Sequence, residues 1–398
     1  MQSAGYRAQS KKMDKKSRVS IVGCGDYDPK KLRESIQKSL DLIGGLGTVM
    51  RKGDNVLLKP NMMAGKAPEF AINTHPLFVG ALFEVIRDFG AKAVIAESPG
   101  GAIFGTKRVW KNSGMEDVAK KIGAPILKLE TCGNVKFNPK FSKKEFYISK
   151  PVLDADVVVS VPKFKVHGTM LLTGAIKNLL GTIPGIHKID FHKEAPKPDE
   201  FGDALSDIFA AVKPKLAVMD AIVGMEGNGP TFGNPRQVGF VLAGNDCVAM
   251  DAVVAQMMGI PPLDVYATKH AARKGLGVAD LKKIEISGVS LEQAKIKGWK
   301  LDFTSNSVVK KIPRVLLKLY GAGFKADMIA SEKKCKACGE CVKGCPTQAR
   351  FLDNNLSKAD SKKCVRCLQC FEICKTRAIR PKFSYLAKQW LKSQAGGI

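Results

Sequence analysis

The sequence contains no long apolar run. A membrane-spanning helix needs about 18 uninterrupted apolar residues. The nearest approach, Met170–Ile186, is broken by polar or helix-breaking residues such as Lys177 and Pro184. Residues 1–18 are polar and basic and lack the apolar segment of roughly 7–15 residues that a secretory signal requires. We therefore expect neither a transmembrane segment nor export, and a reducing, cytoplasmic location.

Aromatic residues are also scarce, at 7%, although the formal net charge reaches +27. The charge favours an acidic partner, surface or substrate. Nucleic acid is one such partner, but basic grooves that bind it usually carry interleaved aromatic side chains or a known module, and both are missing. No GxxxxGK[ST] loop occurs, which argues against a P-loop ATPase. The sequence thus points to an acidic redox protein partner or an anionic small molecule.

The first 330 residues hold only three of the eleven cysteines, Cys24, Cys132 and Cys247, and the other eight fall between Cys335 and Cys374. A secreted disulfide scaffold would need an oxidising compartment. In a reducing one, a dense group of cysteines indicates metal binding. We therefore expect a metal-binding segment near the C-terminus and three ordinary thiols elsewhere.

Buried strands alternate with amphipathic helices over most of the chain. Short apolar runs between helical patterns are typical of a mostly parallel sheet covered on both faces. We predict an α/β domain of this kind, followed by a small α+β domain that holds the C-terminal cysteines. The predicted strands are Val19–Gly23, Val56–Lys59, Ala93–Glu97, Val157–Val161, Leu216–Met219 and Val238–Ala243. The clearer predicted helices are Pro29–Ile43, Pro76–Phe89, Lys107–Ile122, Ala204–Val212 and Ala249–Met258.

Composition divides the chain into five segments. Residues 1–18 carry six Lys or Arg and one Asp, and residues 331–398 carry fifteen basic and five acidic residues, so both ends are markedly basic. The predicted segments are a basic tail (1–18), the α/β domain (19–300), a connector (301–330), the cysteine-containing domain (331–382) and a C-terminal helix (383–398).

The C-terminal cysteines repeat one spacing, CxxCxxCxxxC, in two runs separated by residues 346–363. Zinc sites prefer two separated CxxC pairs with four ligands in total, which this pattern fits poorly. The duplicated spacing resembles that of bacterial ferredoxins with two 4Fe–4S clusters. The resemblance implies that each run supplies three ligands to one cluster and one to the other. Cluster I would take Cys335, Cys338, Cys341 and Cys374, and cluster II would take Cys364, Cys367, Cys370 and Cys345.

Polar and glycine-rich segments follow several predicted strands. In open α/β sheets, residues just beyond the carboxyl ends of strands face the ligand. Lysine, histidine and asparagine side chains there would form a basic pocket for a carboxylate or phosphate, with glycines allowing close backbone approach. The alternative is that each lysine is a solvated surface charge and each glycine only a turn. The candidate binding residues are Lys59, Asn61, His75, Lys163, Lys177, Asn178, Gly227 and Gly229, and the candidate catalytic residues are His167 and Lys165.

Several of these segments together resemble the domain of unknown function 362 family, which is often fused to a ferredoxin-type segment. The resemblance covers roughly residues 19–290 and supports the domain and its motif residues more than any reaction. It is carried by Lys59-Pro60-Asn61, Glu97-Ser98-Pro99-Gly100, Lys163-x-Lys165-x-His167, Thr173-Gly174-x-x-Lys177-Asn178-x-x-Gly181, Glu226-Gly227-x-Gly229-Pro230 and Asp246-x-x-x-x-Asp251-Ala252.

Two functions follow from these patterns. In the first, two 4Fe–4S clusters pass single electrons to or from an α/β domain that binds an anionic substrate or a further anionic cofactor, as in a ferredoxin-linked oxidoreductase. His167 or Lys165 would then donate a proton, because reduction commonly requires a positioned acid. In the second, the chain is a non-catalytic electron carrier or assembly factor that docks on a redox partner. Nucleic-acid binding is the least supported alternative.

Overall fold

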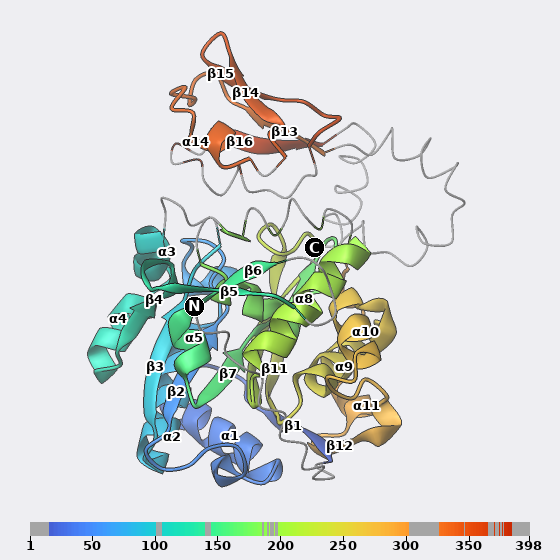
Figure 1. Cartoon of the computed structure of the whole chain (residues 1–398). Helices are drawn as coiled ribbons and strands as arrows, with labels where there is room; N and C mark the ends of the chain where they lie inside the picture. The colour runs from blue at the N-terminus through green and yellow to red at the C-terminus, as the bar shows by residue number, and fades with distance from the viewer. Residues whose placement is uncertain are drawn as a thin grey trace.

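The chain is described by a computed structural model as two units, a larger one before residue 302 and a smaller one after residue 325 (Figure 1). The structure describes residues 16–100, 106–139, 145–184, 198–301, 326–345, 347–364 and 378–383, and residues 187, 188, 191, 195, 370, 374 and 376.

A ten-stranded sheet forms the framework of the larger unit, with strand order β12-β1-β11-β10-β7-β2-β3-β4; β8 pairs with β10, and β9 pairs with β8. Neighbouring strands are parallel except where β11 pairs with β1 and with β10 and where β8 pairs with β9. The mostly parallel α/β sheet predicted from the sequence is therefore confirmed. The strands are β1 (Ser17–Gly23), β2 (Asn55–Pro60), β3 (Lys92–Glu97), β4 (Ile126–Lys128), β7 (Val157–Val161), β8 (Lys163–His167), β9 (Leu171–Leu172), β10 (Leu216–Glu226), β11 (Asn234–Gly244) and β12 (Ile284–Gly288). A separate hairpin joins β5 (Asn134–Phe137) to β6 (Phe146–Ser149).

Helices α1 to α4 pack on one face of this sheet, against side chains of β2, β3, β7 and β10. Helix α2 illustrates why they form, because Pro76 has the backbone angle of a first helical turn. The helix ends where Gly90 adopts a φ of 100°, a left-handed conformation that glycine takes without strain. The bounds are α1 (Pro29–Leu42), α2 (Pro76–Phe89), α3 (Thr106–Asn112) and α4 (Met115–Ile122).

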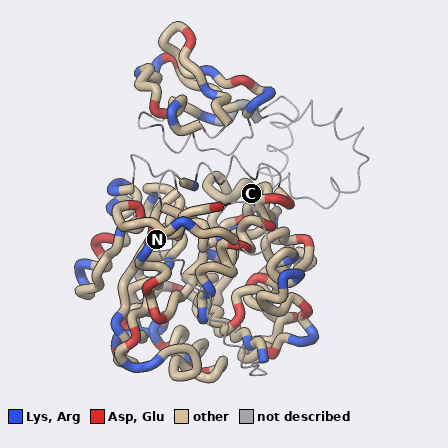
Figure 2. Tube along the Cα trace, in the orientation of Figure 1, with Lys and Arg blue, Asp and Glu red and all other residues tan. Residues whose placement is uncertain are grey.

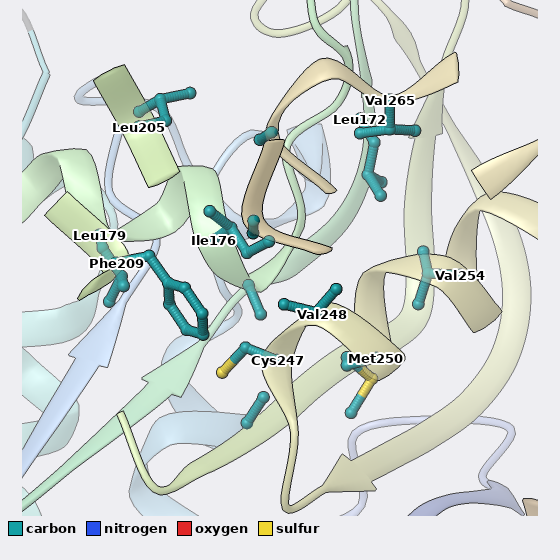
Figure 3. Packing of buried hydrophobic residues seen from close by; sticks show 14 of the residues in the cluster. Leu172, Ile176, Leu179, Leu205, Phe209, Cys247, Val248, Met250, Val254 and Val265 are labelled. Carbon is teal, nitrogen blue, oxygen red and sulfur yellow. The ribbon is translucent and has the colours of Figure 1, made fainter. Parts of the chain in front are cut away.

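The opposite face of the sheet carries α5, α6 and α8 to α11 and the larger hydrophobic core. Figure 3 shows this core between α6, α8 and α9, where Ile176, Phe209 and Val248 point toward one another. Cys247 lies in the same apolar packing and is 1% exposed, as expected for an ordinary core thiol. The bounds are α5 (Lys150–Asp154), α6 (Gly174–Asn178), α8 (Pro198–Val212), α9 (Cys247–Met257), α10 (Tyr266–Arg273) and α11 (Leu291–Ala294). Short 3₁₀ turns are η1 (Leu46–Thr48), η2 (Pro68–Phe70), η3 (Leu129–Thr131), η4 (Leu179–Thr182), η5 (Pro262–Asp264) and η6 (Leu281–Lys283).

The prediction of one continuous helix was wrong. The sequence pattern suggested a single helix over Lys107–Ile122, whereas the structure has two, α3 and α4. They are separated at Gly114, whose φ of 74° lies in the left-handed region and cannot continue a right-handed helix. The break lets both helices bury apolar side chains against the sheet, with Trp110 and Met115 both 0% exposed.

The described residues of the smaller unit form two antiparallel strand pairs and one short helix. β13 (Ala326–Ala330) pairs with β16 (Ile379–Phe383), and β14 (Arg350–Asp353) pairs with β15 (Leu356–Ala359). Helix α14 spans Glu340–Lys343, and the unit is the small ferredoxin-type domain expected from the sequence. Because β13 pairs with β16, residues 326–330 belong to this unit rather than to the connector in which we placed them. The other predicted segment boundaries stay predictions, and most of the predicted tail and the predicted C-terminal helix lie outside the described residues.

Charged side chains are spread over both units. Figure 2 shows Lys and Arg interspersed with Asp and Glu along the described parts of the chain. Many exposed lysines pair with carboxylates, such as Lys31 with Asp26 at 3.0 Å. No helix within the described ranges is long and apolar enough to cross a membrane.

Candidate functional site

Strands β2 and β7 lie side by side where the chain changes direction across the sheet. β3 pairs with β2 on one side. β7 pairs with β2 on the other side and is itself the neighbour of β10. This is a topological switch point, and ligands of open α/β sheets bind beyond the carboxyl ends of the strands there. Lys59 pairs with Ser160 and Pro60 with Val161, so both strands end together. The predicted lysines and asparagines lie at or just after these strand ends.

Lys59 is buried in a dense polar network at the end of β2. Its ammonium forms an ion pair with Glu97 at the end of β3, and both side chains are at most 2% exposed. The ammonium also donates to the carbonyl oxygens of Pro60 at 3.0 Å and Asn178 at 2.8 Å. Asn178 returns a hydrogen bond from Nδ2 to the Lys59 carbonyl at 2.7 Å. Burial lowers the pKa of Lys59 and raises the pKa of Glu97, while the ion pair acts in the opposite sense on each.

Lys163 forms a second buried ion pair, with Asp220 of β10, at 2.7 Å. The two side chains are 1% and 0% exposed. The Tyr27 hydroxyl donates to Asp220 Oδ1 at 2.8 Å and accepts from Lys163 Nζ at 2.9 Å. Burial, followed by the charge of Asp220, raises the pKa of Tyr27, so the phenol stays neutral. The three groups satisfy one another within the protein.

His75 covers this pair from the start of α2. Its ring stacks on Tyr27 with 3.7 Å between ring centroids, and its backbone N–H donates to Asp220 at 2.9 Å. Nδ1 accepts from the Leu77 N–H at 3.3 Å, which places the ring proton of the neutral form on Nε2. Burial is the main cause that lowers the pKa of His75 to about 4. At neutral pH His75 is therefore a neutral hydrogen-bond donor and adds no positive charge to the site.

The two candidate catalytic residues have internal contacts. Lys165 is 1% exposed, and its Nζ donates to the Ile72 carbonyl oxygen at 2.7 Å. His167 is partly buried at the end of β8, and its Nδ1 accepts from the Met170 N–H at 3.3 Å. Both residues therefore contribute to holding the loops beyond the strands, and their catalytic roles stay predictions.

The candidate glycines differ from each other. Gly227 has a φ of 79° and donates its N–H to the Lys300 carbonyl at 2.7 Å, so the turn itself requires glycine. At Gly229 an added Cβ would lie 2.2 Å from the Val166 carbonyl oxygen. The position therefore has to be glycine for packing against β8, whether or not a ligand approaches it.

Lys177 differs from the other three predicted lysines, because no described residue forms a hydrogen bond or ion pair with it. Burial, followed by the nearby positive charge of Lys59, lowers its pKa to about 8. Lys188, which the sequence did not single out, has the same kind of environment, with a pKa of about 8 caused mainly by burial. Its ammonium donates to Ser98 Oγ at 2.9 Å, beside the end of β3.

Several buried oxygen atoms at this edge have no hydrogen-bond partner among the described residues. They are Glu97 Oε1, Asn61 Oδ1 and both carboxylate oxygens of Glu130. Buried polar atoms are nearly always paired in folded proteins, and leaving one unpaired costs roughly 1–3 kcal/mol. Glu97 is the strongest case, since its side chain is 2% exposed. The edge thus has spare acceptors next to a buried ammonium, an arrangement that a polar ligand could complete.

The aspartates of the predicted motif have structural contacts. Asp251 accepts from the backbone N–H groups of Ala175 at 2.5 Å and Ile176 at 3.1 Å, which fixes the start of α6. Gly174 has to be glycine, because an added Cβ would lie 2.5 Å from Asp251 Oδ2. Asp246 caps α9 through the N–H groups of residues 248 and 249. These residues hold α6, and thereby Lys177 and Asn178, at the edge of the sheet.

Sequence reasoning missed the partners of the predicted lysines. Tyr27, Asp220 and Lys188 were not candidates, although each lies in the network. The signal available for Asp220 was a carboxylate directly after the apolar run Leu216–Met219, where an unpaired charge would be costly. The sequence contains no comparable signal for Lys188 or Tyr27.

Two of the cysteines predicted for cluster I, Cys341 and Cys374, lie in or against the small apolar core of the smaller unit. Cys341 is 7% exposed, and burial is the main cause that raises its pKa. No three possible metal ligands among the described residues are grouped closely enough to hold a metal ion, so the ligand set of cluster I stays a prediction. The Ala378 N–H lies 3.2 Å from Cys374 Sγ. Backbone N–H groups directed at cysteine sulfur stabilise thiolates and suit an iron–sulfur ligand.

Of the cysteines predicted for cluster II, Cys370 lies in the same small apolar core. Cys370 is 8% exposed, and burial is the main cause that raises its pKa, followed in the same direction by the charges of Cys364 and Cys345. The Ala349 N–H lies 3.2 Å from Cys345 Sγ. Cys367 lies outside the described residues. The donor set of the unit, several thiols around a small apolar core and N–H groups directed at sulfur, fits 4Fe–4S clusters.

Comparison with known proteins identifies both units. A family model described as Domain of unknown function (DUF362) matches residues 56–256, and a 4Fe-4S dicluster domain model matches residues 327–375. The chain belongs to the DUF362 family. The family resemblance noted in the sequence is thereby confirmed, and the C-terminal unit is a 4Fe–4S domain that supports iron–sulfur electron transfer. The number of clusters implied, two, is consistent with the dicluster model.

Two individual proteins resemble this DUF362 chain. A thylakoid-associated protein of Synechocystis sp. is 31% identical over 300 residues, which cover 75% of this chain and 92% of that protein. The structure of the lactate racemase apoprotein from Thermoanaerobacterium thermosaccharolyticum is 14% identical, with a TM-score of 0.36. The match covers 52% of this chain and about half of the racemase, 51%. At that TM-score the likeness carries no argument about fold or activity.

Proposed function

We propose that this DUF362 protein is a ferredoxin-linked oxidoreductase that exchanges single electrons between its 4Fe–4S clusters and a small anionic substrate or cofactor. The ligand would bind beyond the carboxyl ends of β2, β3 and β7. The cluster ligands predicted from the cysteine spacing are part of this proposal. So is a cytoplasmic location, which the sequence suggests.

Lys177 is the observation that carries the proposal. Lys59 and Lys163 are neutralised by buried carboxylates, and Lys165 Nζ is already bound to the Ile72 carbonyl oxygen. The Lys177 side chain has no described acceptor, and desolvation strengthens the attraction between its ammonium and an anion. A partly buried ammonium with a lowered pKa is typical of binding and catalytic sites.

The unpaired acceptors refine the class of ligand. Glu97 Oε1 and Asn61 Oδ1 accept hydrogen bonds, so the ligand has to bring a donor as well as an anionic group. A small hydroxy or amino carboxylate has both. His75 Nε2–H adds a neutral donor near the same strand ends, which suits a carbonyl or carboxylate oxygen.

Equilibrium binding tests this proposal without any assumption about the reaction. Glycolate and glycolamide form a matched pair of probes, because they differ in charge but share the hydroxyl group. We expect calorimetry to detect binding of glycolate, or of another member of a panel of small hydroxy and amino carboxylates, and weaker binding of its amide. In K177Q the affinity should fall at least about tenfold, since charge-assisted hydrogen bonds contribute about 1.5–3 kcal/mol.

A matched control separates the site from general electrostatics. Lys38 is exposed on α1, so K38Q removes the same formal charge from the surface. It should leave binding unchanged. If no anion of the panel binds the wild-type protein, or if K177Q and K38Q bind alike, the proposed site is wrong.

A second candidate function is an electron carrier or assembly factor that docks on an acidic redox partner. Large apolar side chains on the 4Fe–4S unit favour it, since Phe351 is 45% and Leu352 43% exposed on β14. Apolar residues within a basic surface are common in protein interfaces. Under this alternative the chain would copurify with a protein partner, and the anion panel would not bind.

A further inference from the structure

Arg350 occupies the centre of the 4Fe–4S unit. It begins β14 and is 3% exposed. Its Nη2 donates to the Met328 carbonyl of β13 at 2.6 Å, and its Nη1 donates to the Ser357 hydroxyl of β15 at 3.1 Å. The same hydroxyl lies 3.0 Å from Cys341 Sγ. The guanidinium is therefore held within one residue of a predicted cluster ligand.

The charge of Arg350 has no counter-charge among the described residues, because no described carboxylate pairs with it. Its Nε is buried and has no hydrogen-bond partner within the described part of this unit. A guanidinium stays ionised in proteins, and burying one without compensation is strongly unfavourable. The missing negative charge has to come from a group that the polypeptide does not supply on its own.

One predicted ligand of each cluster lies in the small apolar core of this unit. Cys341 and Cys370 are both buried in that core, and Cys374 packs against it. Arg350 is linked to Cys341 through the Ser357 hydroxyl, which accepts from the guanidinium at 3.1 Å and lies 3.0 Å from the Cys341 sulfur. Arg350 is thus linked most directly to a predicted ligand of cluster I.

The internal duplication shows that this position does not require arginine. Cys345 and Cys374 are equivalent in the two runs, and each receives an N–H at 3.2 Å from the alanine four residues later. The next residue is Arg350 in the first half and Ile379 in the second. Ile379 is 1% exposed and packs in the small apolar core. An apolar side chain therefore fits the equivalent place, and the charge is specific to the first half.

We propose that Arg350 raises the reduction potentials of the two 4Fe–4S clusters, with the larger effect on the cluster held by Cys335, Cys338, Cys341 and Cys374. An oxidised 4Fe–4S core with four thiolates has a net charge of about −2, and one added electron makes it about −3. A fixed positive charge stabilises the more negative, reduced state. Hydrogen bonds and charges around cluster sulfurs are known to tune potentials in this way.

This inference depends on the cluster assignment and is independent of the anion site in the larger unit. It assigns Arg350 a positioning and electrostatic role, because the residue changes where electrons reside and forms no bond to a reacting substrate. The competing explanation is that Arg350 only ties β13 to β15 through its hydrogen bonds. A redox readout distinguishes the two, since a purely structural tie would not change the potential of correctly assembled clusters.

The test is an anaerobic redox titration of full-length protein, followed by EPR, with iron and sulfide content measured on the same samples. R350Q removes the charge and keeps a hydrogen-bonding side chain, and R350I copies the second half of the repeat. R380Q is the matched control, because Arg380 is exposed on β16 of the same unit. At a fixed solution potential near the midpoint, the reduced-to-oxidised ratio of at least one cluster should fall about tenfold or more in R350Q. For a one-electron couple this equals about 59 mV.

The remaining variants fix the interpretation. R350K, which keeps the charge, should stay closer to the wild-type protein than R350Q does. If R350Q and R350I hold full iron and sulfide but titrate like R380Q, the proposal is wrong. It is also wrong if R350K, holding full iron and sulfide, titrates as far from the wild-type protein as R350Q does or further, because the charge at position 350 would then not set the potential.

Discussion

Replacing Glu97 by Gln tests the buried network at the end of β2 and β3. In the wild-type protein the Glu97 carboxylate neutralises the Lys59 ammonium, and both are almost completely buried. The E97Q side chain has nearly the same shape but carries no charge. Lys59 keeps its carbonyl acceptors from Pro60 and Asn178, so its hydrogen bonds survive while its charge is uncompensated.

The expected cost follows from the chemistry of lysine. Lys59 can escape an uncompensated charge by losing its proton, and its ordinary pKa is 10.5. At pH 7.5 this deprotonation costs about 4 kcal/mol, at about 1.36 kcal/mol for each pH unit below the pKa. That figure agrees with the roughly 3–5 kcal/mol measured when one partner of a buried ion pair is removed. We expect E97Q to lose about 4 kcal/mol of unfolding free energy at pH 7.5.

The sign of the pH dependence is also fixed. In E97Q the folded state holds Lys59 with a lowered pKa, so the unfolded state binds more protons up to about pH 10. The variant therefore gains stability relative to the wild-type protein as pH rises, and its deficit should shrink by about 1.4 kcal/mol for each pH unit above 7.5.

Chemical unfolding followed by the fluorescence of buried Trp110 and by circular dichroism measures these differences. The double variant K59M/E97Q removes the stranded charge and should be more stable than E97Q alone. E292Q is the control, because Glu292 pairs with Lys295 on the surface, where ion pairs contribute little. If E97Q is no less stable than E292Q, or if its deficit does not change with pH, the buried-pair reasoning is refuted.

Three further predictions concern other parts of the chain. G181A should destabilise the larger unit in thermal unfolding, because its Cβ would lie 1.9 Å from a buried carboxylate oxygen, whereas G133A, with open space around the Cβ, should not. H75N should abolish a gain in stability of up to about 3 kcal/mol that the wild-type protein shows as pH rises from about 4 to 6.5. The folded state holds His75 with a pKa of about 4, against an ordinary value of 6.5. Between these pH values the unfolded state binds more protons than the folded state, so a falling pH favours unfolding. C338S should lose iron and the EPR signal of one cluster, while C132S, outside the duplicated runs, should keep the full content; equal iron in both would contradict the ligand assignment.

The iron–sulfur unit could be predicted from the sequence because its chemistry is local. The cysteine ligands recur at fixed short spacings, and three thiols of each run converge from one turning loop. The duplicated spacing places Arg350 at the position that is equivalent to Ile379 in the second half. Its burial and its lack of a carboxylate partner could not be predicted, because they depend on how β13 and β15 pack around it.

The strand-end site was predictable in position but not in charge. Lys59 and Lys163 were expected to line an open basic pocket, and the structure instead pairs them with Glu97 and Asp220. Those carboxylates come from strands 38 and 57 residues away in sequence, and their register with the lysines is set by the sheet. Sequence patterns show which residues end a strand, but the pairing across strands arises from the tertiary fold. Of the four predicted lysines, Lys177 is the one whose ammonium has no hydrogen bond or ion pair to a described residue, as expected for a lysine that binds a ligand.

The measurement that tests the central claim most directly follows electrons from the clusters to the anion site. Full-length protein is reduced anaerobically, and its EPR signal is followed after addition of a small carboxylate that binds it. We predict the spectrum of two interacting 4Fe–4S clusters, and a faster loss of that signal with the carboxylate present in the wild-type protein and K38Q but not in K177Q. A reduced spectrum without 4Fe–4S clusters, or re-oxidation rates that no bound carboxylate changes, would contradict the account.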